Sequence, residues 1–211
     1  MAEKHSLLVW PNPQEWTPGT GHLVLSAPLS LATHGDAPWL PAATRQAAEV
    51  LNRAAKGTGP VVVEGEGGGA TWRVTTMETL PPGLKPVLED EGYVLDVTRS
   101  GVLLAGRDAR GVFWGAQTLA QLMEDRDGLS LPMVTIRDWP RYHIRGAHCY
   151  LPAREHIDFF WRFLDFLAGY KCNTLVLEVA GGMEYKKHPE INEAWARFCQ
   201  DVVNYDFHND P

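Results

Sequence analysis

The sequence predicts an α+β domain followed by the first βαβα portion of a (β/α)8 TIM barrel. Short strand candidates, separated by turns that contain Gly or Pro, share residues 1–137 with two amphipathic helices. From Arg141 onward, strand and helix patterns alternate, which is typical of right-handed βαβ units. We therefore expect a non-catalytic α+β domain over residues 1–137. Residues 138–211 should form the truncated start of a barrel domain, because two units precede Pro211 and a complete barrel has eight.

The first helix is predicted over residues 40–54, whose apolar side chains recur at helical spacing. Pro41 lies in the first turn, where its missing N–H costs nothing, and Gly57 follows as a stop signal. Two short strand candidates precede this helix, the apolar run Leu7–Val9 and residues His22–Ser26.

A glycine-rich stretch, residues 65–70, separates two further strand candidates, Pro60–Glu64 and Thr71–Thr76. Such a stretch after a strand superficially suggests a phosphate-binding loop. A dinucleotide site needs a helix N-terminus directly after the glycines, whereas here a second strand follows. We therefore reject nucleotide binding at this place.

The end of the first domain shows a hairpin and a second helix. Residues Gly92–Thr98 and Val102–Ala105 are predicted to pair around the turn at Ser100-Gly101. Asp108 is the expected N-cap of a helix whose apolar face runs from Val112 to Met123. A last strand is predicted over residues 131–136, and both helices should cover one face of the sheet. Three tryptophans are expected in cores, namely Trp72, Trp114 and Trp161.

Asp138-Trp139-Pro140-Arg141 interrupts the pattern and marks the domain boundary. The barrel portion then begins with a strand over residues 144–151 and a helix over about 154–170, which carries enough Phe and Leu to predict heavy burial. Residues 173–179 form a near-continuous apolar run, as in parallel strands that are buried on both faces. Residues 189–200 are predicted to form a further helix.

Composition limits the classes of function. The net charge of −7, without a run of Lys or Arg, argues against a nucleic-acid partner. No apolar stretch approaches the roughly 20 residues of a membrane span, and the first residues lack the apolar core of a secretion signal. Three cysteines, Cys149, Cys172 and Cys199, fit neither a disulfide framework nor a zinc knuckle. We expect a cytoplasmic protein with reduced thiols, no cofactor and no membrane partner. His143 and His148 should point to opposite faces of a strand, so a shared metal is not expected.

The most specific motifs of the sequence are GRDARGVFWGAQTL at residues 106–119 and the bridge LPMVTIRDWPR at residues 131–141. Both resemble glycoside hydrolase family 20, the β-N-acetylhexosaminidases. EGYVLDV at residues 91–97, YKCNTL at residues 170–175 and PNPQ at residues 11–14 are also similar to the family. The resemblance implies a β-hexosaminidase domain 2-like fold, then a TIM barrel. It further implies an oligosaccharide substrate that contains N-acetylhexosamine, hydrolysed with retention by a substrate-assisted mechanism.

The family's catalytic Asp-Glu pair is expected at the end of barrel strand four. No catalytic residue is therefore assigned in this chain, which we expect to be inactive by itself. The sequence also departs from the family at two places. The usual Asp of barrel strand one is replaced by Tyr150, and Arg154 fits the family's sugar-binding Arg only with one inserted residue. Residues 180–185, AGGMEY, replace the usual Asp pair and Trp after strand two.

Substrate-binding residues are expected where barrel active sites lie, at the carboxyl ends of the strands. The candidates are Arg154, Glu178 and Glu184. Arg154 can donate a forked pair of hydrogen bonds to sugar hydroxyls, and otherwise is a solvated first-turn residue. A charge within the apolar strand at Glu178 is costly unless it is paired, which favours a site role or a structural ion pair. Glu184 is otherwise part of a surface loop.

Two other functions stay open at this point. The chain can be a non-catalytic scaffold or a carbohydrate-binding module. It can also be the leading part of another sugar hydrolase, such as an α-glucuronidase or an enzyme that removes N-acetylglucosamine from proteins, since these families carry a similar leading domain.

Overall fold

A computed structural model describes residues 7–25, 29–55, 61–64, 72–124, 130–179 and 183–204. The chain divides into two compact units. The first comprises residues Met1–His143 and Ala168–Lys171, and the second comprises residues Ile144–Leu167 and Cys172–Pro211. The compact units thus divide after His143. The boundary between residues 137 and 138, as the limit of an independently folding domain, stays a prediction.

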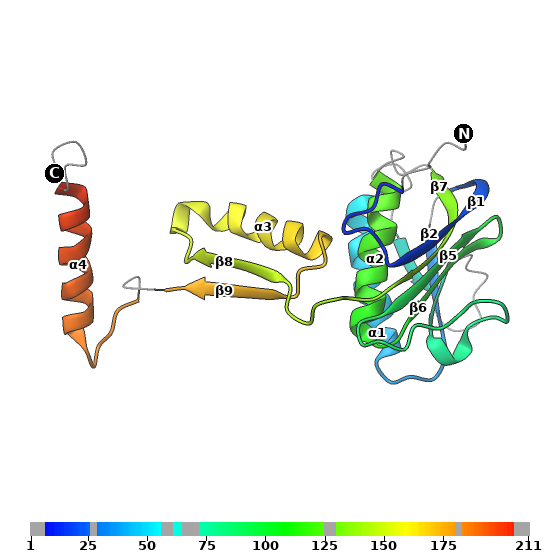
Figure 1. The fold of residues 1–211 in the computed structure, drawn as a ribbon, viewed down its shortest axis with the longest axis horizontal. Helices are drawn as coiled ribbons and strands as arrows, with labels where there is room; N and C mark the ends of the chain where they lie inside the picture. The colour runs from blue at the N-terminus through cyan, green and yellow to red at the C-terminus, as the bar shows by residue number, and fades with distance from the viewer. Residues whose placement is uncertain are drawn as a thin grey trace. The chain divides into compact units, whose positions relative to one another are not determined.

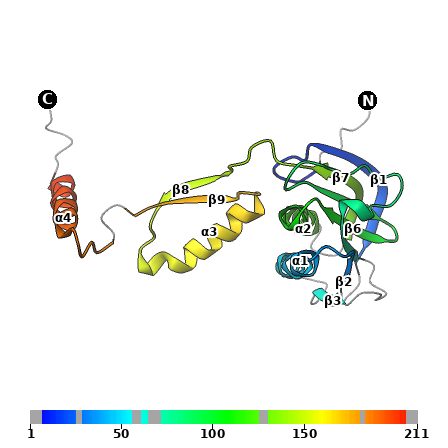
Figure 2. The same ribbon diagram turned by 90° about the horizontal axis from the view of Figure 1, so that it is seen from below.

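The first unit is a mixed sheet with helices on one face, as Figure 2 shows for α1 and α2. Its elements are β1 (Glu15–Val24), β2 (Leu29–His34), α1 (Leu40–Ala54), β3 (Val61–Glu64), β4 (Trp72–Thr76), the 3-10 turn Met77–Thr79, β5 (Tyr93–Thr98), β6 (Gly101–Gly106), α2 (Ala109–Glu124) and β7 (Ser130–Asp138). The seven described strands follow the order β1-β7-β5-β6-β4-β2-β3. The predicted α+β class and the placement of both helices on one face are confirmed.

The predicted hairpin is confirmed as the antiparallel pair β5–β6. Strand β2 was absent from the expected elements. It lies between β3 and β4 and is parallel to both, so β3 and β4 are not neighbours. The predicted turn at residues 65–70 lies outside the described residues. The run Leu7–Val9 forms no strand, although Val9 is fully buried.

Strand β1 starts at Glu15, well before the predicted start at His22. Strand propensity is low at Pro18, Gly19 and Gly21, so the sequence pattern did not predict the first part of this strand. Its pairing with β7 shifts register between Pro18 and His22, as at a β-bulge. A Cβ on Gly19 would lie 2.8 Å from Cβ of Met133, so the close approach of these two strands requires glycine at this place.

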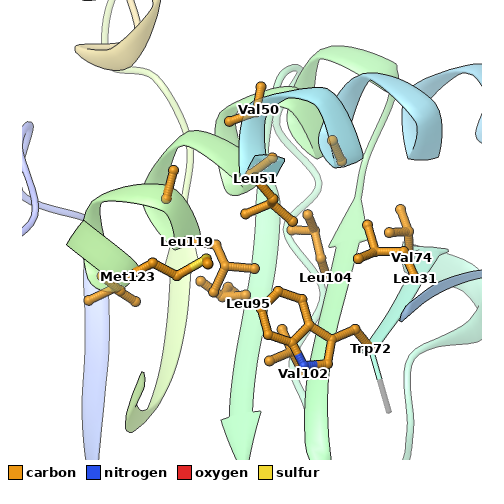
Figure 3. Packing of buried hydrophobic residues seen from close by; sticks show 14 of the residues in the cluster. Leu31, Val50, Leu51, Trp72, Val74, Leu95, Val102, Leu104, Leu119 and Met123 are labelled. Carbon is orange, nitrogen blue, oxygen red and sulfur yellow. The ribbon is translucent and has the colours of Figure 1, made fainter. Parts of the chain in front are cut away.

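The core of the first unit lies between the sheet and the two helices, and Figure 3 shows part of its packing. Leu51 of α1 and Leu119 of α2 each retain 1% exposure, and Leu95 and Leu104 of the sheet are also buried. Trp72 and Trp114 belong to this core, as predicted. The apolar faces that the helical spacing indicates are therefore the faces that pack on the sheet.

Helix α2 approaches the sheet through two glycines. A Cβ on Gly111 would lie 2.1 Å from the carbonyl oxygen of Gly92. A Cβ on Gly115 would lie 2.3 Å from Cδ1 of Leu104 and 3.0 Å from the Tyr93 ring. The glycine spacing within the family-like motif thus has a packing reason, because any side chain would push the helix away from the sheet.

The second unit begins with a parallel strand-helix-strand arrangement, in which α3 runs beside β8 and β9 (Figure 1). Its elements are β8 (Gly146–Tyr150), the 3-10 turn Arg154–His156, α3 (Ile157–Gly169), β9 (Thr174–Glu178) and α4 (Pro189–Asn204). The last two residues of α3 are grouped with the first unit. The predicted element order is confirmed.

Two expectations for this part are wrong. The helix α3 contains no buried residue, although heavy burial is predicted. Trp161 is 59% exposed and belongs to no core among the described residues. Both differences have the same reason: in the second unit α3 runs beside the two strands β8 and β9 (Figure 1), which cover only one side of the helix, so its other side stays exposed. None of the described helices combines the length and the apolar character that crossing a membrane requires.

Candidate functional site

The candidate site lies at the carboxyl ends of the parallel strands β8 and β9. Along β8, His148 and Tyr150 are exposed, whereas Cys149 between them is half-buried. The register places Tyr150 beside Glu178, and paired residues of neighbouring strands share one face of the sheet. His148, Tyr150 and Glu178 therefore lie on the open face of this two-stranded sheet.

The contact that defines the site joins His148 to Glu178. Nε2 of His148 lies 3.1 Å from Oε2 of Glu178, with 55% and 42% of the respective side chains exposed. The Tyr150 ring is tilted by 53° to the His148 ring, with 6.2 Å between the ring centroids. The arrangement offers a carboxylate acceptor, an imidazole and a phenol on one solvent-accessible face, which is a hydrogen-bonding set for a polar ligand.

The structure places the three predicted site residues at different positions. Glu178 ends β9 on the open face, and its backbone carbonyl accepts a hydrogen bond of 3.0 Å from Leu151 N. Arg154 begins the 3-10 turn after β8 and is exposed, and no described contact joins it to Glu178. Glu184 is exposed beyond β9. Their roles in substrate binding stay predictions.

The turn that carries Glu184 is held by one amide side chain. Asn192 of α4 accepts a hydrogen bond from Tyr185 N at 2.8 Å and donates one to the Met183 carbonyl at 2.6 Å. The backbone on both sides of Glu184 is therefore fixed to the start of α4. The Glu184 side chain remains accessible to solvent.

Sequence reasoning missed His148 as a candidate. Its spacing from His143 was weighed for a shared metal, but its partner is Glu178, 30 positions away in the chain and two register positions along the parallel pair. This pair could have been predicted only if the register between β8 and β9 had been known. Among the residues that the structure describes, no group of three or more His, Cys, Asp or Glu side chains is arranged to hold a metal ion.

A strongly perturbed titratable group lies elsewhere, in the core of the first unit. Burial of Tyr93 and the nearby charge of Asp138 raise the pKa of the tyrosine well above its ordinary value. The Tyr93 hydroxyl donates to Asp138 Oδ2 at 3.0 Å, and Nζ of Lys171 lies 2.9 Å from the same hydroxyl. All three side chains are buried, so this cluster has no access for a substrate and is structural.

A second charged group caps α2. Asp108 accepts a hydrogen bond from Gly111 N at 2.8 Å and forms an ion pair with Arg110 at 2.6 Å. Burial acts to raise the pKa of Asp108, but the hydrogen bonds from Gly111 N, Arg110 and Glu91 N and the charge of Arg110 together lower it below its ordinary value. Buried Glu91 accepts a hydrogen bond from Trp114 Nε1 at 2.8 Å. The charged residues of the two family-like motifs, Glu91 in residues 91–97 and Asp108 and Arg110 in residues 106–119, therefore stabilise the fold and are not arranged for catalysis.

A family model and several known proteins match this chain. The family model described as glycosyl hydrolase family 20, domain 2, matches residues 7–139. A β-hexosaminidase of Vibrio vulnificus is 36% identical over 116 residues, which are 52% of this chain and 14% of that protein. A lacto-N-biosidase of Bifidobacterium bifidum is 28% identical over 199 residues, which are 92% of this chain and 16% of that protein.

Solved structures extend the likeness beyond the first unit. The N-acetyl-β-hexosaminidase of Streptomyces plicatus matches 82% of this chain and 34% of its own, with a TM-score of 0.63 and 28% identity. A β-N-acetylhexosaminidase of Bacteroides fragilis matches 88% of this chain with a TM-score of 0.66 and 19% identity, which shows the fold alone. The chain spans about a third of these two structures and less than a fifth of the two relatives above.

The fold and these similarities place the chain in a class of proteins with a shared architecture. In this class, a mixed sheet with two helices on one face precedes a parallel strand-helix-strand element. Within that class, the chain belongs to glycoside hydrolase family 20.

Proposed function

We propose that this chain is the N-terminal portion of a β-N-acetylhexosaminidase-like enzyme, which acts on oligosaccharides that contain N-acetylhexosamine. The observation that supports this most is the family match over residues 7–139, directly followed by a parallel strand pair with polar side chains at its carboxyl end. A relative named β-hexosaminidase matches 52% of this chain. Barrel enzymes hold their active sites at that end of the strands, which is where His148 and Glu178 lie.

In the proposed reaction, the acetamide oxygen of the substrate attacks the anomeric carbon, so that the sugar supplies its own nucleophile. An Asp orients the amide and a Glu protonates the leaving oxygen, and the family resemblance places both on barrel strand four. Glu178 is proposed to accept hydrogen bonds from sugar hydroxyls. Arg154 is proposed to donate a forked pair of hydrogen bonds, and Glu184 to line the rim of the site.

The test is an assay of the full-length product against a panel of aryl glycosides. Hydrolysis of N-acetylhexosaminides with retention of anomeric configuration would support the proposal. A trifluoroacetamide substrate should react more slowly, since its carbonyl oxygen is a weaker nucleophile. Preferential hydrolysis of aryl glucuronides would instead support the α-glucuronidase alternative, and no hydrolysis of any glycoside would support a non-catalytic scaffold or carbohydrate-binding module.

By the same reasoning, the 211-residue chain alone should not hydrolyse glycosides. The purified chain is incubated with nitrophenyl N-acetylglucosaminide, beside the full-length product as the positive control. Measurable hydrolysis that disappears on mutation of a carboxylate within residues 1–211 would show that the active site has been misplaced.

Cytoplasmic localisation is part of this proposal. It is supported by Cys149, Cys172 and Cys199, which form no disulfide in the described structure. Cell fractionation with an antibody against the chain would test it, and recovery of the protein in the culture medium or in a membrane fraction would contradict it.

A further inference from the structure

The sheet face opposite the helices of the first unit carries a pocket of about 190 Å³. Its lining includes Arg73, Pro81, Asp96, Thr98, Ser100 and Leu103. Every lining residue belongs to the first unit, and none belongs to β8 or β9. None of these residues takes part in the function proposed above.

Strand register builds the floor of this pocket. Leu103 of β6 pairs with Arg73 of β4 on one side and with Asp96 of β5 on the other. The three residues therefore form a row across the sheet, with the two charged residues about 10 Å apart, two strand spacings, on either side of a leucine. Their chain neighbours Val74, Leu104 and Leu95 are buried toward the helices, so the row faces away from the core.

The polar groups of the row are available to a ligand. Arg73 is exposed and its guanidinium makes no hydrogen bond or ion pair with the residues that the structure describes. Asp96 is half-buried and uses Oδ1 to accept a hydrogen bond of 2.7 Å from Thr135, which holds the carboxylate in place. The hydroxyls of Thr98 and Ser100, which are 2.9 Å apart, add groups that can donate or accept.

We propose that this pocket binds a single pyranose ring of a neutral glycan. Leu103 offers an apolar surface for the C–H face of the ring. Asp96 accepts from hydroxyls at one edge of the ring and Arg73 donates at the other. The opposite charges discriminate against ligands with a net charge, since either an anion or a cation meets a like charge on one side. The small volume fits one ring and excludes a longer ligand lying wholly inside.

The 211-residue chain is used for the test, with amide NMR spectra recorded during titration with glucose, galactose, mannose and N-acetylglucosamine through the millimolar range. At least one sugar should bind and shift the amide signals of residues 96–103. Arg73→Gln and Asp96→Asn should each weaken that binding about tenfold, because each variant removes a charged hydrogen-bond partner. Arg45→Gln and Asp36→Asn, exposed and outside the pocket, are the matched controls and should bind as the parent chain does.

Four outcomes would overturn the proposal. One is that none of the sugars shifts these signals. Another is that binding persists unchanged in both pocket variants, and a third is that the two control variants lose it equally. The last is that glycine or inorganic phosphate displaces the sugar, which would assign the pocket to a small charged ligand. Because glycosidase activity is not measured, a failure here leaves the function proposed above untouched.

Discussion

The ammonium group of Lys171 lies 2.7 Å from Oδ2 of Asp138, and 33 residues separate the two in the chain. Both side chains are buried, and the Tyr93 hydroxyl contacts both. Asp138 Oδ1 also accepts a hydrogen bond from Gln14 N at 3.1 Å. The carboxylate thus connects the start of β1, the middle of the sheet and Lys171. Lys171 is therefore a structural part of the first unit, although the segment Ile144–Leu167 of the second unit precedes it in the chain.

We predict that Lys171→Met destabilises the chain by about 3–5 kcal/mol. The methionine fills a similar volume but leaves the Asp138 carboxylate buried without its cation. Urea unfolding, followed by tryptophan fluorescence, measures the change in free energy. Lys186→Met is the matched control, since Lys186 is exposed, and should change stability by less than about 0.5 kcal/mol.

The double variant Lys171→Met/Asp138→Leu separates the loss of the ion pair itself from the cost of leaving the Asp138 carboxylate buried without a cation. Removing both charges should recover much of the loss, since an apolar pair of similar volume often replaces a buried ion pair at little cost. If Lys171→Met alone unfolds at the same urea concentration as the parent chain, the ion pair does not stabilise the first unit.

A second prediction concerns the contact of α2 with the sheet. Gly111→Ala should destabilise the chain by about 1–3 kcal/mol, because the new Cβ would overlap the Gly92 carbonyl and backbone atoms must move. Gly169→Ala is the matched control, since no atom lies within 4 Å of its added Cβ and it sits in a helix. That control should be neutral or slightly stabilising. Equal melting temperatures for Gly111→Ala and the parent chain would contradict the close approach.

The third prediction concerns pH. The pKa of Asp108 in the folded chain lies below its ordinary value of 3.8, so as the pH falls the unfolded chain binds this proton first. The stabilisation is therefore present above about pH 4 and is lost as the pH falls through the folded-state pKa. Asp108→Asn keeps an N-cap acceptor for Gly111 N but cannot titrate, so its stability should fall less steeply between about pH 5 and pH 2.

Thermal unfolding at several pH values measures this dependence. Asp36→Asn, which removes an exposed carboxylate, controls for the loss of a charge alone. Asp108→Ala should additionally lose about 1 kcal/mol at neutral pH, since it removes the cap. If the stability of the parent chain and that of Asp108→Asn fall equally steeply as the pH is lowered, Asp108 is not a source of the acid sensitivity.

The fourth prediction concerns the candidate site in the full-length product. Glu178→Gln and Arg154→Ala should each lower kcat/KM for an N-acetylhexosaminide at least about tenfold, the equivalent of ~1.4 kcal/mol. His148→Gln should have a smaller effect in the same direction, since it removes the imidazole beside Glu178 and leaves the carboxylate. Glu155→Gln, an exposed residue next to Arg154, is the control. Kinetics close to those of the parent enzyme in all three site variants would remove these residues from the site.

The sequence by itself determined the elements whose signals are local. Helical spacing predicted α1 and α2 and the faces they bury. The turn at Ser100-Gly101 predicted the β5–β6 hairpin, and Asp108 was predicted as the N-cap whose hydrogen bond to Gly111 N the structure contains. These features depend on residues within one or two turns of each other, so periodicity and capping rules suffice to predict them. The motifs around residues 106–119 were enough to indicate the family.

Only the tertiary structure decided the relationships between distant residues. The insertion of β2 between β3 and β4, the pairing of His148 with Glu178 and the burial of Lys171 against Asp138 have no local signal. Parallel strands are joined by long connections, so a turn cannot set their register. The partner of a buried charge is chosen by the packing around it, because a charge that loses water needs an opposite charge wherever the fold brings one close.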